Sequence, residues 1–246
     1  MGSTRLPGKV MELVNGKPII QWQLERILRS KRIQKLIVAI PEGTQDDLLA
    51  EFLKQNGYLI SRGSLNNVFQ RFVGALSVDS PSNFVRITAD CPLIMSEILD
   101  NMILEFQKRE VDYLSNALEH TFPDGLDLEI VKTDAFLKLQ SFELSVAEQE
   151  HVTLGLYSRS QYFKVSSYSS GLNLGSERWT LDYPEDLRFI SKVYDFFKGR
   201  ETEFTLSEVI ELLTRNPGIR NELAGELRNI ALKRTFELGS DNERTL

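Results

Sequence analysis

Hydrophobic residues in the first half of the chain recur at intervals that switch between helical and strand spacing. Ile20, Leu24 and Ile27 lie on one face of a predicted helix, and the short apolar run at 36–40 then has the length of a buried strand. The alternation continues to Leu114. Parallel strands need crossover connections, so this order predicts an α/β fold with a mostly parallel sheet and helices on both faces. We expect further helices at 46–55, 68–78 and 98–106, and further strands at 58–60, 84–88 and 111–114.

The alternation of helical and strand spacing stops between residues 116 and 175. This segment contains an apolar run at 128–131, a helical pattern that starts at Thr133, and a Ser- and Gly-rich stretch at 166–176. None of these continues the regular alternation of the first half. We interpret 116–175 as an insertion that shapes a substrate pocket or a dimer contact.

The last quarter of the chain is predicted to be helical. Pro184 suits the first turn of a helix, and a second helical pattern begins at Leu206 and continues towards the C-terminus. The final residues become polar, and we expect that end to be frayed. The expected division is a main domain at 1–200, which includes the insertion, and a C-terminal helical extension at 201–246.

Composition narrows the class of protein. With 41% hydrophobic and 26% charged residues the chain is in the ordinary globular range, and no apolar run is long enough to span a bilayer. The N-terminus has no signal-peptide pattern and Cys91 is the single cysteine, so we expect a protein of the reducing cytoplasm. A net charge of −6 gives no general attraction for nucleic acid. Zinc is not expected either, because one cysteine and two separated histidines match no zinc-ligand spacing.

The opening segment combines the features of a phosphate-binding loop. Residues 2–9 contain two glycines, two hydroxyl side chains, Arg5 and Lys9. Glycines allow the backbone to approach a phosphate, Arg5 can bind it with two donors, and Lys9 supplies a point charge. The alternative interpretation is a mobile terminus with unrelated basic residues, and this segment alone does not decide between the two. The candidate phosphate-binding residues are Gly2, Ser3, Thr4, Arg5 and Lys9.

Two aspartates lie directly after short apolar stretches. Asp90 follows the strand predicted at 84–88, where open α/β sheets bind ligands, and Asp182 precedes the helix that begins at Pro184. Mg²⁺ prefers one or two carboxylates, with phosphate and water oxygens in its other positions, so this pair can hold one Mg²⁺ on a triphosphate. Each aspartate also has a structural interpretation, Asp90 as the cap of a turn and Asp182 as the N-cap of the helix.

A third group of polar residues lies in the insertion. The segment 122–129 contains a Pro-Asp-Gly turn that leads into a strand, and its three acids can hydrogen-bond a polyhydroxylated substrate. His151 lies further along, and a histidine in such a position is more often structural than catalytic. No local signature of a Ser/His/Asp or Cys/His nucleophile is present. The candidate substrate-binding residues are Asp124, Asp127, Glu129, His151 and Thr153.

Together these motifs resemble the cytidylyltransferase family of acidic sugars. That family includes CMP-sialate synthetases, 3-deoxy-manno-octulosonate cytidylyltransferases and the spore-coat polysaccharide biosynthesis protein F type, which the chain resembles most. The resemblance spans almost the whole chain, and the joint pattern is far more specific than any single motif. The matching segments are MGSTRLPGKV at 1–10, NGKP at 15–18, RGS at 62–64, VRITADCPLI at 85–94, FPDGLDLE at 122–129, EHVT at 150–153 and RWTLDYPEDL at 178–187.

The resemblance implies a Rossmann-like nucleotide-diphospho-sugar transferase fold, usually homodimeric, without nucleic acid or membrane as a partner. The implied reaction transfers CMP from CTP to an acidic 2-keto-3-deoxy sugar for surface polysaccharide biosynthesis. By position, Arg5 and Lys9 would contact the phosphates, while Asp90 and Asp182 would hold Mg²⁺. The other implied contacts are Arg62, Gly63, Ser64 and Arg71 towards the nucleotide, and Asp124, Asp127, Glu129, His151 and Thr153 towards the sugar.

The sequence departs from the family pattern in two places. The family's first strand, and the Gln-Ala-Arg that precedes Met-Gly-Ser-Thr-Arg, are absent from the sequence as given, so we expect a core strand and one phosphate-binding arginine to be missing. The segment 65–68 carries amides where the family tends to have acids. Two other functions stay open. One is a nucleotide-sugar glycosyltransferase, although no paired-Asp DxD motif is evident around Asp90; the other is a non-catalytic relative, which the absent strand favours.

Overall fold

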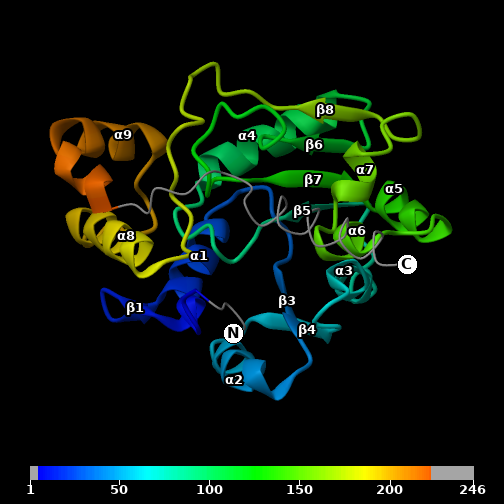
Figure 1. Ribbon diagram of the computed structural model, residues 1–246, viewed down its shortest axis with the longest axis horizontal. Coiled ribbons are helices and arrows are strands. Elements are labelled where there is room, and N and C mark those ends of the chain that lie inside the picture. The colour runs from blue at the N-terminus through cyan, green and yellow to red at the C-terminus, as the bar shows by residue number, and fades with distance from the viewer. Residues whose placement is uncertain (1–4, 223–246) are drawn as a thin grey trace, which may run out of the picture.

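Helices and strands alternate along the first half of the chain in the predicted order (Figure 1). The structure is a computed structural model that describes residues 5–222. The strands are β1 (Leu13–Val14), β2 (Lys17–Pro18), β3 (Ile37–Pro41), β4 (Leu59–Gly63), β5 (Asn83–Arg86), β6 (Tyr113–Ser115), β7 (Glu129–Lys132) and β8 (Val165–Ser167). The α-helices are α1 (Ile19–Ile27), α2 (Asp47–Gln55), α3 (Val68–Leu76), α4 (Ser96–Lys108), α5 (Thr133–Lys138), α6 (Val146–Glu150), α7 (Leu154–Tyr157), α8 (Pro184–Phe196) and α9 (Leu206–Arg215).

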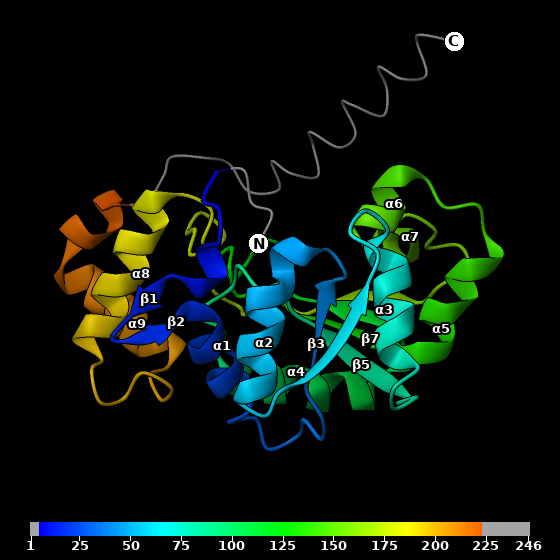
Figure 2. The ribbon, with the colours of Figure 1, turned by 90° about the horizontal axis from the view of Figure 1, so that it is seen from below.

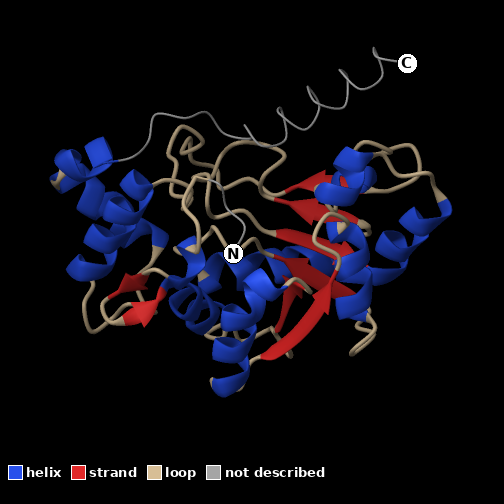
Figure 3. Cartoon of the chain, turned by 60° about the horizontal axis from the view of Figure 1, so that its bottom comes forward, coloured by secondary structure: helices blue, strands red, loops and turns tan. Residues whose placement is uncertain are grey.

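The strands form two larger sheets and one small hairpin. β3 and β4 pair in parallel, while β5, β7, β6 and β8 form a four-stranded sheet in that order. β7 is antiparallel to both of its neighbours, so the expectation of a mostly parallel sheet is corrected to a mixed one. The reason is that only a loop connects β6 to β7, and a parallel strand would need a longer crossover. The β1–β2 hairpin lies apart from the larger sheets (Figure 3).

Helices cover these sheets from several sides. α2 and α3 flank the β3–β4 sheet (Figure 2). None of the helices within residues 5–222 has the length and apolar character needed to cross a bilayer. In the same part of the chain, no strand is hydrogen-bonded to both larger sheets.

The segment 116–175 supplies strands to the larger sheet as well as helices that pack on it. It contributes β7 and β8, and residues of α5 and α7 share one hydrophobic cluster with α3, for example Phe136 and Leu156 with Phe69. β8 begins one residue before the Ser- and Gly-rich stretch, which we had not expected to contain a strand. The insertion is therefore part of the folded core beside the sheet.

The C-terminal helix α9 shares the largest hydrophobic cluster with the main domain. Val209, Leu212 and Leu213 of α9 are buried in the cluster that also contains residues of α1, α4 and α8. The extension is thus packed against the main domain as far as the structure describes it. The helical continuation and polar tail expected beyond residue 222 lie outside the described residues.

Arg26 on α1 is a buried cation that joins three parts of the chain. Its guanidinium donates to the carbonyl oxygens of Ile94 at 2.7 Å, Glu201 at 2.7 Å and Phe204 at 3.0 Å. The first acceptor precedes α4 and the other two precede α9. Burial lowers the pKa of Arg26 to about 10, so the side chain keeps its charge at neutral pH. Arg26 therefore anchors the C-terminal extension to α1.

Replacing Arg26 with Met should destabilise the fold, because three carbonyl oxygens lose their donor. A hydrogen bond to a charged group contributes roughly 1.5–3 kcal/mol, so we expect a loss of at least ~3 kcal/mol in thermal or urea unfolding. The matched control is Arg29→Met, since Arg29 forms a surface pair with Glu203 in which the side chains are 45% and 49% exposed. Equal stability of the two variants would contradict the anchoring role.

Candidate functional site

A cavity of about 420 Å³ opens at one edge of the four-stranded sheet β5–β7–β6–β8. It is lined by residues at the carboxyl ends of β5 and β6 and at the amino end of the antiparallel β7, so all three strands present residues to the same edge. Ligands of open α/β sheets bind at such an edge. The sequence-predicted residues that line the cavity are Arg5, Asp90, Asp124, Asp127, Glu129, His151, Thr153 and Asp182.

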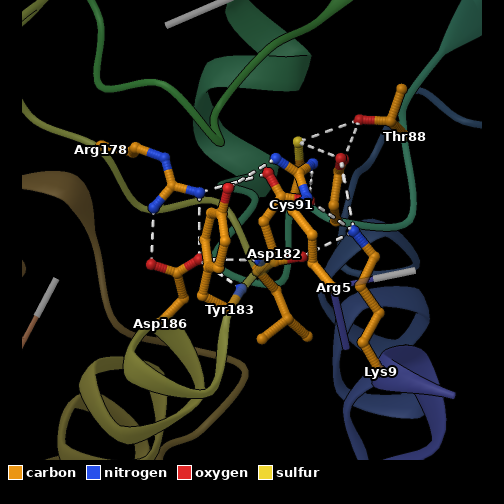
Figure 4. Close-up of polar contacts among 10 residues, drawn as sticks. Arg5, Lys9, Thr88, Cys91, Arg178, Asp182, Tyr183 and Asp186 are labelled. Atoms are coloured by element: carbon orange, nitrogen blue, oxygen red, sulfur yellow. Dashed lines mark hydrogen bonds and ion pairs between the residues drawn. The ribbon is translucent and has the colours of Figure 1, made fainter. Parts of the chain in front are cut away.

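The carboxylate of Asp182 binds three cations (Figure 4). Lys9 Nζ lies 2.9 Å and Arg5 Nη2 lies 3.2 Å from its Oδ1, while Arg178 Nη2 lies 3.2 Å from its Oδ2. Burial alone would raise the pKa of Asp182, but the attraction of these cations, Lys9 first, outweighs it and lowers the pKa. Asp182 is therefore ionised and links the opening loop to the segment before α8.

Lys9 brings the two predicted metal ligands into contact with one cation. Its ammonium donates to the Leu181 carbonyl oxygen at 2.7 Å and lies 3.9 Å from Oδ2 of Asp90, in addition to its bond with Asp182. Thr88, just after β5, holds the other oxygen of Asp90 through its hydroxyl. The structure thus brings Asp90 and Asp182 together from separate parts of the chain.

The oxygen atoms around the Lys9 ammonium are of the kind that bind a nucleotide-bound Mg²⁺. The ammonium is surrounded by oxygens of Asp90, Leu181 and Asp182, so a positive charge is already stabilised at this position. Within residues 5–222, no group of three or more His, Cys, Asp and Glu side chains is arranged to hold a metal by itself. Two carboxylates leave further positions for phosphate and water oxygens, which is the arrangement that Mg²⁺ prefers.

Asp186, rather than Asp182, caps helix α8. Its Oδ2 accepts hydrogen bonds from the backbone N–H groups of Asp182 at 2.8 Å and Tyr183 at 2.9 Å. Arg178 also binds the buried Asp186 carboxylate with two bonds, at 2.6 and 3.0 Å. The N-cap interpretation of Asp182 is thereby corrected, because Asp186 satisfies the helix terminus and leaves the Asp182 carboxylate to the cations.

The Pro-Asp-Gly turn brings the acids of the insertion to the cavity. The backbone N–H of Asp124 donates to the Glu177 carbonyl at 2.9 Å, and the N–H of Trp179 donates to the Asp124 carbonyl at 2.6 Å. Gly125 has φ = +104°, and a Cβ there would lie 2.6 Å from the Trp179 carbonyl carbon. Only glycine fits this close approach, which positions Asp124 and Asp127 in the cavity lining.

Glu129, at the start of β7, is already bound by three neighbours. Arg86 pairs with its Oε2, the Tyr113 hydroxyl donates to its Oε1 at 2.6 Å, and the Thr153 hydroxyl donates to the same Oε1. Burial and the charge of Glu129 raise the pKa of Tyr113 well above its usual value, so Tyr113 stays a donor. Glu129 and Thr153 therefore line the cavity as members of a closed hydrogen-bond network.

Five described residues predicted to bind the nucleotide are not in the cavity lining, although one of them, Lys9, contacts the lining residues Asp90 and Asp182. Arg62 donates to the carbonyl oxygens of Pro41, the last residue of β3, and Gly43, and it pairs with Asp47 at 2.6 Å. Arg71 donates to the carbonyl oxygen of Ser64 at 2.6 Å. Both arginines thus hydrogen-bond backbone carbonyls outside the cavity lining. The predicted residues that do not line this cavity are Lys9, Arg62, Gly63, Ser64 and Arg71. Gly2, Ser3 and Thr4 lie outside the described residues.

Several residues that line the cavity were not identified from the sequence. Arg86 and Thr88 line the cavity together with Asp90, and their spacing of two residues is the strand period, which was an available signal. Tyr113 and Arg178 had no such signal. Their hydrogen-bond partners follow 16 and 8 residues later in the chain, and only the fold brings them into contact.

The sequence profile of the cytidylyltransferase family matches residues 1–213. The chain belongs to this family. It is 30% identical over 231 residues to the spore coat polysaccharide biosynthesis protein SpsF of Bacillus subtilis, covering 90% of this chain and 94% of that protein. The structure of a cytidylyltransferase from Leptospira borgpetersenii is 32% identical, has a TM-score of 0.86, and covers 92% of this chain and 95% of its own. A 3-deoxy-manno-octulosonate cytidylyltransferase of Hydrogenovibrio crunogenus is 30% identical over 117 residues, 45% of each chain.

These similarities confirm the family resemblance and the α/β nucleotidyltransferase fold of this cytidylyltransferase. The match includes the opening loop and the segments that carry Asp90 and Asp182. The geometry of the cavity described above is therefore that of a family member.

His151 of this cytidylyltransferase should be neutral at neutral pH. Burial lowers its pKa, Glu150 and Glu129 oppose the shift, and Arg86 adds to it. We expect an NMR titration midpoint below the usual value of 6.5 for the one of the two histidines whose signal disappears in His151→Asn. The unfolded chain takes up this proton at a higher pH, so His151 stabilises the fold above the unfolded pKa, and this contribution is lost as the pH falls through the folded pKa. A midpoint above 6.5 would mean that the neighbouring carboxylates dominate instead.

Proposed function

We propose that this protein is a Mg²⁺-dependent cytidylyltransferase that transfers CMP from CTP to an acidic 2-keto-3-deoxy sugar in surface polysaccharide biosynthesis. The observation that carries the proposal is the contact of Lys9 with Asp90 and Asp182, two residues that line one cavity in a member of the cytidylyltransferase family. Two relatives support the choice of substrate class, since one is named for spore coat polysaccharide biosynthesis and another for 3-deoxy-manno-octulosonate.

The cations around Asp182 would bind the triphosphate of CTP. Without a ligand, Arg5 and Lys9 both contact the Asp182 carboxylate. Phosphate oxygens can replace that carboxylate as acceptors, Arg5 through its planar fork and Lys9 as a point charge. Asp90 and Asp182 would then hold Mg²⁺, which supplies charge neutralisation for the transferred and leaving phosphates.

Positioning of the two substrates is the main contribution of the protein to this reaction. The anomeric hydroxyl of the sugar acid attacks the α-phosphate in line, the new oxygen–phosphorus bond forms, and the bond to the β-phosphate breaks to release pyrophosphate. Asp124, Asp127 and His151 line the cavity and would hydrogen-bond the sugar. We further propose that the protein acts as a homodimer in the cytoplasm, as expected from the family resemblance and from its one, unpaired cysteine.

Replacing Asp90 with Asn should lower turnover by roughly 10²–10³, because the shape is kept while one preorganised charge is lost. The assay is pyrophosphate release from CTP, UTP, ATP or GTP, with Mg²⁺ or with EDTA, in the presence of sialic-acid-like and octulosonic acids. Activity is expected with CTP and Mg²⁺ only. The thermal stability of Asp90→Asn should stay close to that of the wild type.

The matched control is Asp195→Asn, since Asp195 is exposed on α8 and should tolerate the same change without loss of activity. Activity that survives EDTA would contradict the metal mechanism. Activity confined to UTP and a neutral acceptor would favour a glycosyltransferase, and inactivity with every pair of substrates would favour a non-catalytic relative.

A further inference from the structure

Asp182 and the three cations that bind it, Lys9, Arg5 and Arg178, form the Asp182 cluster. The cavity lining contains one arginine that is not part of this cluster. Arg5 and Arg178 line the cavity and both contact Asp182, at the end where the phosphates of CTP would bind. Arg86 lines the same cavity from β5 and pairs with Glu129 instead. The proposed binding of CTP leaves Arg86 without a role.

The guanidinium of Arg86 has one edge without hydrogen bonds. Its Nη1 donates to Glu129, whereas Nε is buried and, within residues 5–222, has no hydrogen-bond partner. No hydrogen bond from Nη2 to the described part of the chain is found either. Nε–H and Nη2–H form one side of the planar group, and two parallel donors of this kind match the two oxygens of a carboxylate. A buried donor without a partner is costly, and a ligand oxygen would relieve that cost.

The network around Glu129 holds Arg86 in a fixed orientation. Tyr113 and Thr153 bind one oxygen of Glu129 and leave the other to Arg86. Burial alone would lower the pKa of Arg86, but the attraction of Glu129 outweighs it and raises the pKa. Arg86 is therefore a charged group, only 18% exposed as a side chain, that is supported through Nη1 and has no hydrogen-bond partner at its buried Nε within the described residues.

We propose that Arg86 binds the carboxylate of the acceptor sugar and thereby selects acids over neutral sugars. This inference rests on the proposed function, because it concerns the second substrate of that reaction. Arg86 and Asp90 line the same cavity from positions four residues apart in the chain, so the carboxylate and the phosphates would share this cavity. In a 2-keto sugar acid the carboxylate and the attacking hydroxyl share one carbon. A carboxylate held by Arg86 would therefore also orient the nucleophile towards the α-phosphate.

The test compares a sugar acid with its uncharged methyl ester. The probes are N-acetylneuraminate, 3-deoxy-manno-octulosonate and the methyl ester of each. Their affinity for the full-length protein is measured by saturation-transfer NMR and calorimetry with CTP present and Mg²⁺ removed by EDTA, so that the proposed reaction does not consume the acids. The wild type should bind at least one acid more tightly than its ester, by about 10- to 100-fold, because a charge-assisted bidentate contact is lost in the ester. Arg86→Gln should abolish this preference.

The matched control is Arg159→Gln. Arg159 pairs with Glu148 outside the cavity, and its side-chain exposure of 19%, with 9% for Glu148, is close to the 18% and 10% of Arg86 and Glu129. This variant should keep the preference for the acid. Because Arg86→Gln leaves Glu129 without a counter-ion, Arg86→Gln/Glu129→Gln serves as a second variant with a neutral pair, and it should show the same loss.

Three outcomes overturn the inference: equal binding of acid and ester by the wild type, no binding of either acid, or a preserved preference in a folded Arg86 variant. CTP binding is measured separately in the same proteins. Arg86→Gln should bind CTP as the wild type does, since Arg86 lies outside the Asp182 cluster. Failure of the wild type to bind CTP would instead contradict the proposed function, whatever the result for the sugar acids.

Discussion

The carboxylate of Asp182, bound by Lys9, Arg5 and Arg178, is the contact on which the cavity depends. Lys9 and Asp182 are 173 positions apart in the sequence, so their bond closes the N-terminal loop onto the segment before α8. The same bond fixes the charge balance of the site. A partly buried carboxylate and a partly buried ammonium each need a partner, and here each serves the other. In the proposed function, a triphosphate with its metal would exchange these partners without leaving either charge unpaired.

The residues around this cluster differ in how firmly they are held. Asp186 is fully buried, caps α8 and accepts two hydrogen bonds from Arg178. Arg178 is therefore held in place by the first turn of α8. The Gly125 turn against Trp179 fixes the opposite wall through backbone contacts. Lys9 and Arg5, by contrast, reach Asp182 from a loop through long side chains. In the proposed function, Lys9 and Arg5 would change partners while Asp186 and the Gly125 turn keep their contacts.

The sequence was sufficient for features that depend on local spacing. The helices at 46–55 and 98–106 follow from apolar periodicity, and Asp90 and Asp182 were found because both follow short strand-like stretches. Features that depend on contacts between distant parts of the chain could not be predicted from the sequence. The antiparallel direction of β7 and the close approach of Gly125 to Trp179 both depend on contacts between separate parts of the chain. The ion pair of Arg62 with Asp47 could not be predicted either, because the two residues belong to different elements.

The most direct test of the central claim is a crystal structure of the protein with CTP and Mn²⁺, in which anomalous scattering locates the metal. The account predicts one Mn²⁺ bound by the carboxylates of Asp90 and Asp182 and by a phosphate oxygen. It also predicts that the Lys9 ammonium, now 2.9 Å from Asp182, has moved to a phosphate oxygen. A metal bound elsewhere, or a nucleotide bound while Lys9 keeps its contact with Asp182, would contradict it.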